Sequence, residues 1–447
     1  MMDRLPPGPR SALLQSVLLT RDNLGHVARC LRRYGDPFTL PVLYTTWVIT
    51  GDPEEARRIF TADPETFGPM AGDEARFMVG AASFPMLEGD HHLASRRLLA
   101  PPFHGARMRA FGRIMADAAI RVLAGVPSGA EFKAQDTGQA ISLDVILEAV
   151  FGVSDPERKA KFRRSIIELL SSQPGVLVIL RPLQREFGGF GPFARFMRRK
   201  RAFNALLFDE LAQRRRVASD GPDILHMMMA ARRADGSAMS DDELRDQLFF
   251  LLLAGHETSA VSMAWALYEL HRHPAALDRL LAEIAAAGPD AEPDAIAALP
   301  YLDAVCQETL RIHPLLSFVP RLLRRPFELR GYRLPTGVNV AVGIGLVHGR
   351  EDLYPEPERF RPERFLERKF SPFEFLPFGG GARRCLGAAF ALYEMKIVLA
   401  TILRDHRLTL LDTGPVRHVL RSGSLGTETG IRMRLDERRA PPPRASA

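Results

Sequence analysis

One decapeptide near the C-terminal end, FGGGARRCLG (Phe378–Gly387), places a cysteine among four glycines and two arginines. Positive charge beside a thiol favours the thiolate, which is the form that attacks electrophiles and binds metals. Glycine costs conformational entropy on folding, so this density of glycine indicates a backbone of special shape. The composition of the decapeptide therefore indicates that Cys385 is used as a thiolate, and it raises the question of what the sulfur holds.

A second unusual stretch is AGHETSA, Ala254 to Ala260, which lies in the middle of a long helical pattern. Ser240 and Glu243 form a capping-box sequence at its start. The pattern continues without proline to about His273, which is roughly 50 Å at 1.5 Å per residue. A helix of that length with an apolar middle is expected to cross the core of the molecule.

This stretch breaks the local rules for a buried helix. Gly255 costs about 1 kcal/mol against alanine in a helix interior, and a buried carboxylate at Glu257 is costly unless it is paired. Such departures, with Thr258 beside them, indicate a functional site. The alternative is a helix that emerges into solvent and leaves Glu257 exposed.

The sequence ETLR places Glu308 and Arg311 at i and i+3, on one face of a helix. By itself this spacing has no diagnostic value, because it recurs at Glu54–Arg57, Glu55–Arg58, Glu269–Arg272, Glu356–Arg359 and Glu358–Arg361.

Composition restricts the class of protein. The 447 residues carry a net charge of +7 and only three cysteines, which is no disulfide framework and favours a reducing compartment. The arginines are spread along the chain, which favours an acidic protein partner over nucleic acid. Neither an apolar run of about 18 residues nor a convincing signal peptide is visible, so we expect a cytoplasmic protein with no membrane contact.

The order of patterns predicts a mainly α fold with a small β region, in one large domain with a long central helix. We place the domain at residues 1–435 and a disordered tail at 436–447, because the end of the chain is rich in proline and arginine. Helical patterns dominate from Pro53 to about Ala286, and a final helix begins near Cys385. The expected strands are Phe38–Leu43, Trp47–Thr50, Phe327–Arg333 and Val338–Val342.

FGGGARRCLG resembles the haem-ligand signature of the cytochrome P450 family, F-x-x-G-x-R-x-C-x-G, at every fixed position. AGHET is similar to the oxygen-activation motif of that family, ETLR to its E-x-x-R motif, and PERF (Pro362–Phe365) to its meander motif. The four motifs follow in the family's order across Ala254–Gly387. LPPGPR (Leu5–Arg10) resembles the proline hinge and HLASRR the haem-contact helix, so the resemblance covers nearly the whole chain and implies the cytochrome P450 fold.

The resemblance implies haem b as cofactor and Cys385 as the ligand of its iron. A thiolate ligand favours cleavage of the O–O bond. In this reading Gly379, Gly380 and Gly381 aim backbone N–H groups at the sulfur, Phe378 shields it, and Gly387 lets the next helix approach the haem. An inert cysteine in a turn is the alternative.

The two haem propionates need cations, for which the family pattern implies Arg383 and Arg321, with His92 and Arg96 one helical turn apart. Solvated surface charge is the alternative for Arg96 and Arg321. The predicted cofactor-binding set is His92, Arg96, Ala254, Arg321, Phe378, Gly379, Arg383, Cys385 and Gly387. Glu308, Arg311 and Arg364 are expected to form a buried ion network that holds the Cys385 loop.

On the other face of the haem, the resemblance implies that Gly255 leaves space for the co-substrate dioxygen. Thr258 would hydrogen-bond the oxygen, and Glu257 with water would relay protons. The implied activity is that of a monooxygenase, which hydroxylates a C–H bond or epoxidises a double bond with one oxygen atom and reduces the other to water.

No flavin or iron–sulfur module is fused to the chain, so a separate ferredoxin and ferredoxin reductase are the expected electron donors to a monomeric enzyme. Arg97, Arg384 and Lys396 are candidates for the docking face, with ordinary solubility charge as the alternative. The substrate is expected to be an apolar small molecule: a terpenoid, fatty acid, steroid or polyketide. The expected pocket residues, of which about half could be plain core, are Phe77, Met78, Phe84, Met86, Leu253, Leu315, Phe318, Val319 and Leu425.

Two other functions fit the same signature. The first is a peroxide-driven peroxygenase or an isomerase, but the presence of Glu257 and Thr258 argues against routes without reductive oxygen activation. The second is a haem-based ligand carrier or sensor, which no visible partner-binding or DNA-binding module supports.

Overall fold

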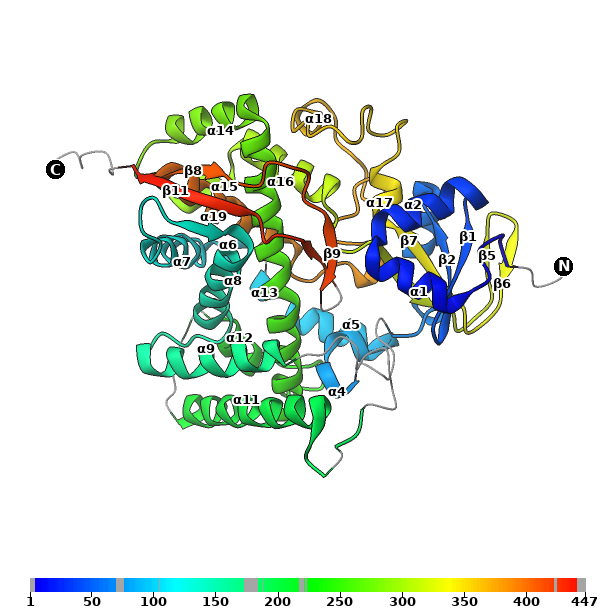
Figure 1. Cartoon of the computed structure of the whole chain (residues 1–447). Coiled ribbons are helices and arrows are strands. Elements are labelled where there is room, and N and C mark those ends of the chain that lie inside the picture. Colours follow the sequence, from blue (N-terminus) through cyan, green and yellow to red (C-terminus); the bar gives the residue numbers. More distant parts are fainter. Residues whose placement is uncertain are drawn as a thin grey trace.

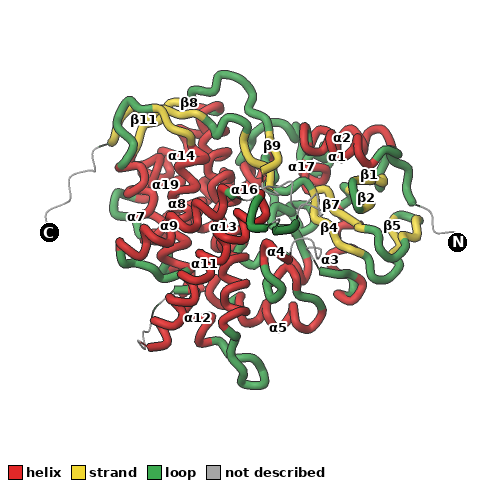
Figure 2. Tube along the Cα trace, turned by 60° about the horizontal axis from the view of Figure 1, so that its bottom comes forward, coloured by secondary structure: helices red, strands yellow, loops and turns green. Residues whose placement is uncertain are grey.

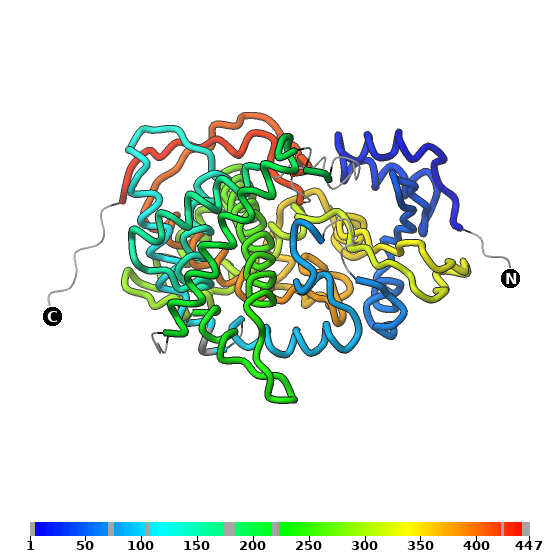
Figure 3. The backbone as a smooth tube through the Cα atoms, turned by 90° about the horizontal axis from the view of Figure 1, so that it is seen from below, coloured from blue at the N-terminus to red at the C-terminus, as the bar shows by residue number. Residues whose placement is uncertain are grey.

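The computed structural model describes residues 5–69, 76–103, 105–172, 184–186, 188–216, 221, 223–421 and 424–439. Most helices gather on one side of the molecule together with β8 and β11, and the sheet that contains β1, β2 and β7 lies on the other side with α1 and α2 (Figure 1, Figure 2). Seen from below, the N-terminal segment in blue lies opposite the helices of the middle of the chain (Figure 3).

The α-helices have the following bounds: α1 Ala12–Arg21, α2 Asn23–Tyr34, α3 Pro53–Thr61, α4 Arg76–Val79, α5 Gly89–Leu99, α6 Gly105–Arg109, α7 Gly112–Ala124, α8 Ala134–Val145, α9 Pro156–Ser171, α11 Gly191–Arg216, α12 Ile224–Ala230, α13 Asp241–Arg272, α14 Pro274–Ala287, α15 Pro293–Ala297, α16 Pro300–Ile312, α17 Ile344–His348, α18 Arg364–Glu367 and α19 Ala388–Asp405. Proline begins α3, α9, α14, α15 and α16, where its missing N–H is no loss. Single 3-10 turns cover Pro64–Thr66, Phe84–Met86, Pro101–Phe103 and Gly381–Arg383, and a π turn, Ile146–Val150, ends α8.

The predicted central helix is α13, and its start is the predicted capping box. The Glu243 N–H donates to Ser240 Oγ, and the Ser240 N–H donates to Glu243 Oε2 at 2.8 Å. The helix continues for 32 residues to Arg272. By length and composition it is the one described helix that could span a membrane, but 56% of its most apolar window is buried inside the protein.

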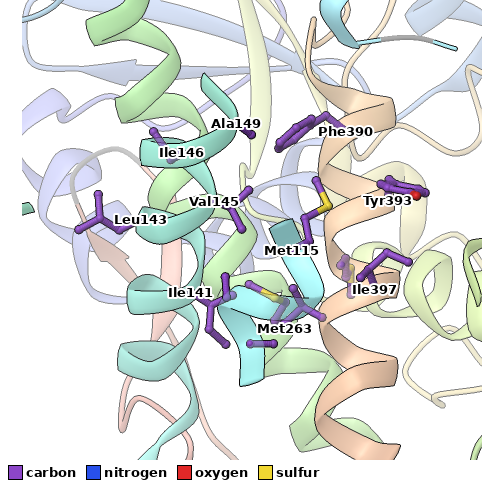
Figure 4. Close-up of a cluster of buried hydrophobic side chains, with 14 of the residues drawn as sticks. Met115, Ile141, Leu143, Val145, Ile146, Ala149, Met263, Phe390, Tyr393 and Ile397 are labelled. Atoms are coloured by element: carbon purple, nitrogen blue, oxygen red, sulfur yellow. The ribbon is translucent and has the colours of Figure 1, made fainter. Parts of the chain in front are cut away.

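Helices α7, α8, α13 and α19 pack around one large hydrophobic core. Met115, Ile141, Met263 and Ile397 contribute buried side chains from these four helices (Figure 4). Gly138 allows α8 to approach α13 closely, because a Cβ there would lie 3.0 Å from the Cα of Ala260. The close crossing holds the middle of α13 against a rigid neighbour.

Four small sheets among the described residues complete the fold. The largest has the order β1-β2-β7-β4, in which β2 runs parallel to β7 with Trp47 opposite Asn339, and β4 is antiparallel to β7. Its strands are β1 Phe38–Val42, β2 Thr45–Thr50, β4 Phe318–Leu322 and β7 Asn339–Gly343. The others are the pair β5 Phe327–Leu329 and β6 Tyr332–Leu334, the pair β9 His418–Arg421 and β10 Ser424–Thr427, and the order β3-β11-β8 with β3 Glu131–Lys133, β8 His406–Leu410 and β11 Arg432–Arg438.

Two predicted boundaries were wrong. The run 327–333 is a hairpin rather than one strand, because Arg330 and Gly331 turn the chain with φ of 44° and 80°. Strand β11 extends to Arg438, so residues 436–438 belong to a sheet and not to the tail predicted to begin at 436. Residues 440–447 of that tail lie outside the described residues.

Candidate functional site

The loop that carries Cys385 passes directly over α3. Gly379 and Gly381 have φ of 64° and 68°, which favours glycine. A Cβ at Gly380 would lie 2.4 Å from the Phe60 ring, and one at Gly381 would lie 1.9 Å from the Phe60 carbonyl oxygen. Close contact with Phe60 therefore accounts for Gly380 and Gly381, which the sequence had assigned to the sulfur.

The Cys385 thiol is exposed, unlike Cys30 and Cys306, which are buried. Desolvation nevertheless raises its pKa, while a hydrogen bond from the Gly387 N–H and the charges of Arg384 and Arg96 act in the opposite direction. A thiol that is reachable and yet surrounded by protein faces an interior space. Because burial is the largest effect, the thiol carries its proton at neutral pH until a cation such as ferric iron displaces it.

Three arginines and a histidine converge beside this loop from α5, β4 and the 3-10 turn at Gly381–Arg383. Burial, with the positive charges of Arg383, Arg96 and Arg321, lowers the pKa of His92 to about 4. Burial also lowers the pKa of Arg321 to about 10, with a further contribution from Arg383. The structure thus brings together the four predicted propionate contacts.

The charge of Glu88 acts on Arg383, but this cationic cluster has no ion-paired carboxylate among the described residues. Among the described residues, Nε2 of the buried His92 has no hydrogen-bond partner. The guanidinium groups donate to backbone carbonyls instead: Arg96 to Arg384 at 2.8 Å, Arg321 to Pro320 at 3.0 Å and Arg383 to Leu87 at 2.9 Å. Within the described part of the chain none of the three arginines forms an ion pair. Two carboxylates of a bound haem would supply the missing charge, so the residues present fit that cofactor.

Glu308, Arg311 and Arg364 form the predicted ion network. Their exposed fractions are 0%, 2% and 3%. Arg311 donates to both Glu308 carboxylate oxygens at 2.7 and 2.9 Å, and Arg364 Nε donates to Glu308 Oε1 at 3.0 Å. The backbone N–H of Arg361 adds a fourth bond to the same carboxylate at 2.9 Å. Glu308 therefore fastens α16 to the segment before α18.

His348 connects this network to the Cys385 loop, and it belongs to none of the motifs identified in the sequence. Arg311 donates to the His348 carbonyl at 2.9 Å, and His348 Nδ1 lies 3.1 Å from the Arg311 carbonyl. The Leu376 N–H donates to His348 Nε2 at 2.8 Å. Since Nε2 accepts, Nδ1 carries the proton. Leu376 lies two residues before Phe378, so the connection ends at the start of the loop.

The middle of α13 presents Ala254 as an exposed residue and Glu257 and Thr258 as half-buried ones. The Thr258 hydroxyl donates to the Ala254 carbonyl at 2.6 Å. Burial raises the pKa of Glu257, which the charge of Arg421 partly offsets. The residue next to Gly255 is Ile146, 3.6 Å from the position of a Cβ. A side chain at Gly255 would thus make only an ordinary contact with the π turn after α8, and Ala254 is the exposed residue beside it.

A cavity of about 610 Å³ lies against this part of α13. Glu257, Ala254 and the predicted pocket residues Leu253 and Met78 line it. Further lining residues come from α4, α8, α9 and α13: Val79, Asp136, Gln139, Ala140, Leu143, Arg163, Ile167, Leu170, Ser171, Phe250 and His256. The lining is mostly apolar, with a few polar groups.

The other predicted pocket residues do not line this cavity. Phe77 packs against Phe193 and Phe196 of α11. Phe318 lies 4.5 Å from Trp47 between ring centroids, and Leu315 is half-buried at the edge of the core. The remaining four have exposed fractions of 9% or less: Phe84, Met86, Val319 and Leu425.

Lys396 does not belong to an exposed docking face, contrary to the sequence-based expectation. Its ammonium donates to the Ala297 carbonyl at 3.0 Å and pairs with Asp303, and its side chain is 13% exposed. Arg97 and Arg384 are exposed.

Glu308→Gln tests whether the ion network stabilises the fold. The change keeps the shape but leaves two buried guanidinium groups without a counter-charge, so we expect a loss of about 3–5 kcal/mol in the free energy of unfolding. Glu356→Gln is the matched control, because Glu356 and Arg359 have the same spacing with both side chains 63% exposed; it should cost about 1 kcal/mol or less. Denaturant unfolding followed by circular dichroism measures both, and equal losses would contradict the assignment.

The chain was compared with known proteins. The sequence profile of the cytochrome P450 family matches residues 6–431. Cytochrome P450 135B1 of Mycobacterium tuberculosis is 39% identical over 441 residues, covering 96% of this chain and 91% of the relative. Cytochrome P450 138 of the same organism is 35% identical over 411 residues, covering 91% and 90%.

Solved structures give the same result. Cyanobacterial CYP120A1 with bound retinoic acid has a TM-score of 0.85 and 25% identity, over 97% of this chain and 99% of that one. This confirms the predicted fold, mainly α with a small β region. The match includes the four motifs and nearly the whole chain, so the chain belongs to the cytochrome P450 family, whose members are haem-dependent monooxygenases.

Proposed function

We propose that this chain binds haem b through Cys385 and uses dioxygen to hydroxylate or epoxidise an apolar small molecule. The observation that carries the proposal is the arrangement around Cys385: a reachable thiol beside a neutral, unpartnered histidine and three buried or half-buried arginines that form no ion pair among the described residues. Haem would supply the redox-active iron at which dioxygen is reduced, and a thiolate ligand favours O–O cleavage.

Each residue around the thiol has a definite task in this proposal. His92, Arg96, Arg321 and Arg383 bind the propionates, for which arginine is suited by its paired donors. The Gly387 N–H stabilises charge on the sulfur. Phe378 and Gly379 shape the loop in front of α19, and Ala254 forms the opposite wall.

Thr258 and Glu257 move protons in this proposal. The Thr258 hydroxyl donates its hydrogen to the Ala254 carbonyl. Its oxygen can therefore accept a hydrogen bond from a water that carries a proton towards the dioxygen co-substrate. Burial raises the pKa of Glu257 above that of an exposed glutamate and so brings it closer to neutral pH. This suits an acid that is repeatedly reprotonated.

The cavity supports an apolar substrate. Leu253, Met78 and Phe250 contribute apolar surface to the cavity, and Glu257 is among its polar lining residues. The solved relative CYP120A1 holds retinoic acid, an isoprenoid acid. We therefore propose a terpenoid, fatty acid, steroid or polyketide as substrate.

Electrons are proposed to come from a ferredoxin and its reductase. Arg97 and Arg384 are exposed near the thiol loop and would attract an acidic partner. We further propose a cytoplasmic monomer with one domain that extends at least to Arg438, supported by three free cysteines and the late strand β11.

The first test is the absorption spectrum of the reduced protein with carbon monoxide, which reports a thiolate ligand by a red-shifted Soret band. We expect this band in the wild type and its loss in Cys385→Ser, because an alcohol is a far weaker electron donor to iron. Retention of the band in Cys385→Ser would overturn the assignment. Turnover with ferredoxin and reductase, compared with peroxide alone, then separates a monooxygenase from a peroxygenase or carrier.

Arg321→Met separates haem binding from stability. Arg321 is 4% exposed and unpaired within the described residues, so its removal should leave the haem-free protein as stable or more stable. Haem transfer to apomyoglobin should become about tenfold faster, because a charge-assisted contact is lost. Arg325→Met is the control, since Arg325 is 56% exposed and pairs with Glu65 and Asp63. A less stable apoprotein with unchanged haem transfer would contradict the role.

Thr258→Ala should divert reducing equivalents to hydrogen peroxide, because proton delivery loses its acceptor. Thr258→Ser keeps the hydroxyl and should retain most of the coupling. The ratio of product formed to NAD(P)H consumed measures the effect in a reconstituted ferredoxin system. An unchanged ratio in Thr258→Ala would show that this hydroxyl takes no part.

A further inference from the structure

Helix α4, Arg76–Val79, is too short to satisfy its own backbone. A helix leaves its last four carbonyls without intrahelical partners, and four residues allow little more than the bond from the Gly80 N–H to the Arg76 carbonyl at 2.9 Å. Met78 and Val79 nevertheless line the cavity. Something outside α4 must therefore hold it in place.

Lys200 of α11 supplies the missing donors. Its ammonium donates to the Phe77 carbonyl at 2.8 Å and to the Met78 carbonyl at 2.9 Å. The residue is 9% exposed, and the ammonium lies 5.2 Å from the centre of the Phe249 ring. A cation at the carbonyl end of a helix also interacts favourably with the helix dipole.

The chain on either side of Gly80 is held by different helices. After Gly80, the Ala82 N–H donates to Asp246 at 3.0 Å and the Phe84 N–H donates to Gln247 at 2.9 Å, so this part is fixed to α13. Before Gly80, the hydrogen bonds and ring contacts are with α11, namely the Lys200 bonds and the rings of Phe193 and Phe196 against Phe77, while α4 also packs against α13. Gly80 has φ of 89°, and a Cβ there would lie 2.1 Å from Asp246.

We propose that Lys200 is a positioning residue for the substrate: its ammonium holds α4 in the place where Met78 closes the cavity, and its loss opens the cavity between α4 and α13. The proposal rests on the proposed function in one respect, that this cavity receives the substrate. Lys200 is not among the residues that line the cavity, whereas Met78 and Val79 of α4 are.

The charge of Lys200 adds a pH dependence. Burial lowers its pKa to about 8, with Asp246 opposing and Arg245 adding to the shift. Arg245 is itself bonded to Asp246 at 2.8 and 2.9 Å, and Arg76 is the charged residue of α4. A neutral amine still donates two hydrogen bonds, but weaker ones than an ammonium. Opening of α4 would return the amine to water, where its pKa rises towards the ordinary 10.5, so raising the pH above about 8 favours the closed position of α4.

The experiment uses the haem-loaded protein and two readouts. Hydrogen exchange of residues 76–84 reports the order of α4, and the dissociation rate of 4-phenylimidazole, an uncharged azole that binds haem iron from the cavity side, reports its closure. In Lys200→Met we expect both rates to rise about tenfold at pH 7, the loss expected for hydrogen bonds to a charged group. Lys161→Met is the control, because Lys161 is 62% exposed on α9.

Lys200→Arg completes the design, because a guanidinium keeps its charge at every pH used. The wild type should release the azole more slowly as the pH rises from 7 to 9.5, whereas Lys200→Arg should bind well with a flat profile. Unchanged exchange and release in Lys200→Met, or equal pH profiles in wild type and Lys200→Arg, would overturn the proposal, as would a general rise of exchange throughout the protein. The carbon monoxide spectrum is recorded for every variant, so that failure of the haem-thiolate assignment is seen separately.

Discussion

Glu308 has no exposed surface, and its two oxygens accept hydrogen bonds from Arg311, Arg364 and the backbone of residue 361. A carboxylate in such a place is tolerated only with its partners complete. The hydrogen bonds of Glu308 and Arg311 join three segments that do not share a sheet or a helix: α16, the long loop before α18, and α17. Through His348 the same network reaches Leu376 and so determines where the Cys385 loop begins. The position of the sulfur thus depends on a buried charge well away from it.

The site next to this network has the opposite electrostatic character. In the ion network, the Glu308 carboxylate lies between two guanidinium groups; the charges that act on His92 and Arg321 are all positive. Burial of unpaired cations lowers the free energy of unfolding. An anionic cofactor would remove this destabilisation by pairing with the cations. Haem would in this sense be a structural component, since its binding adds its own free energy to that of folding.

Sequence reasoning succeeded where function requires a residue type at a fixed spacing. The Cys385 signature, the Glu308–Arg311 pair and the capping box at Ser240 can all be read within ten residues, and the structure has the pair and the box as predicted. Reasoning failed where a role depends on a distant neighbour. Gly381 is explained by Phe60, more than three hundred residues earlier. No local pattern carries such information.

Lys200 and His348 show the same difficulty for polar residues. Each lies in an ordinary helical segment, and each owes its importance to backbone atoms of another element. A sequence pattern identifies side chains that bind side chains by complementary charge. It does not identify hydrogen bonds to backbone carbonyl and N–H groups, because nearly every residue has these groups. Their partners become visible only when the packing of α4 on α11, or of α17 on the loop before Phe378, is known.

The parallel pairing of β2 with β7 has a consequence for how the chain folds. Trp47 lies opposite Asn339, so the N-terminal strands stay incomplete until some three-quarters of the polypeptide has been synthesised. Loop closure over such a separation is entropically unfavourable and slow. During translation β1 and β2 would therefore expose an unpaired edge, which is a site of aggregation. The edge of β2 stays unpaired until β7 emerges, so slower synthesis would lengthen the period in which this edge can aggregate.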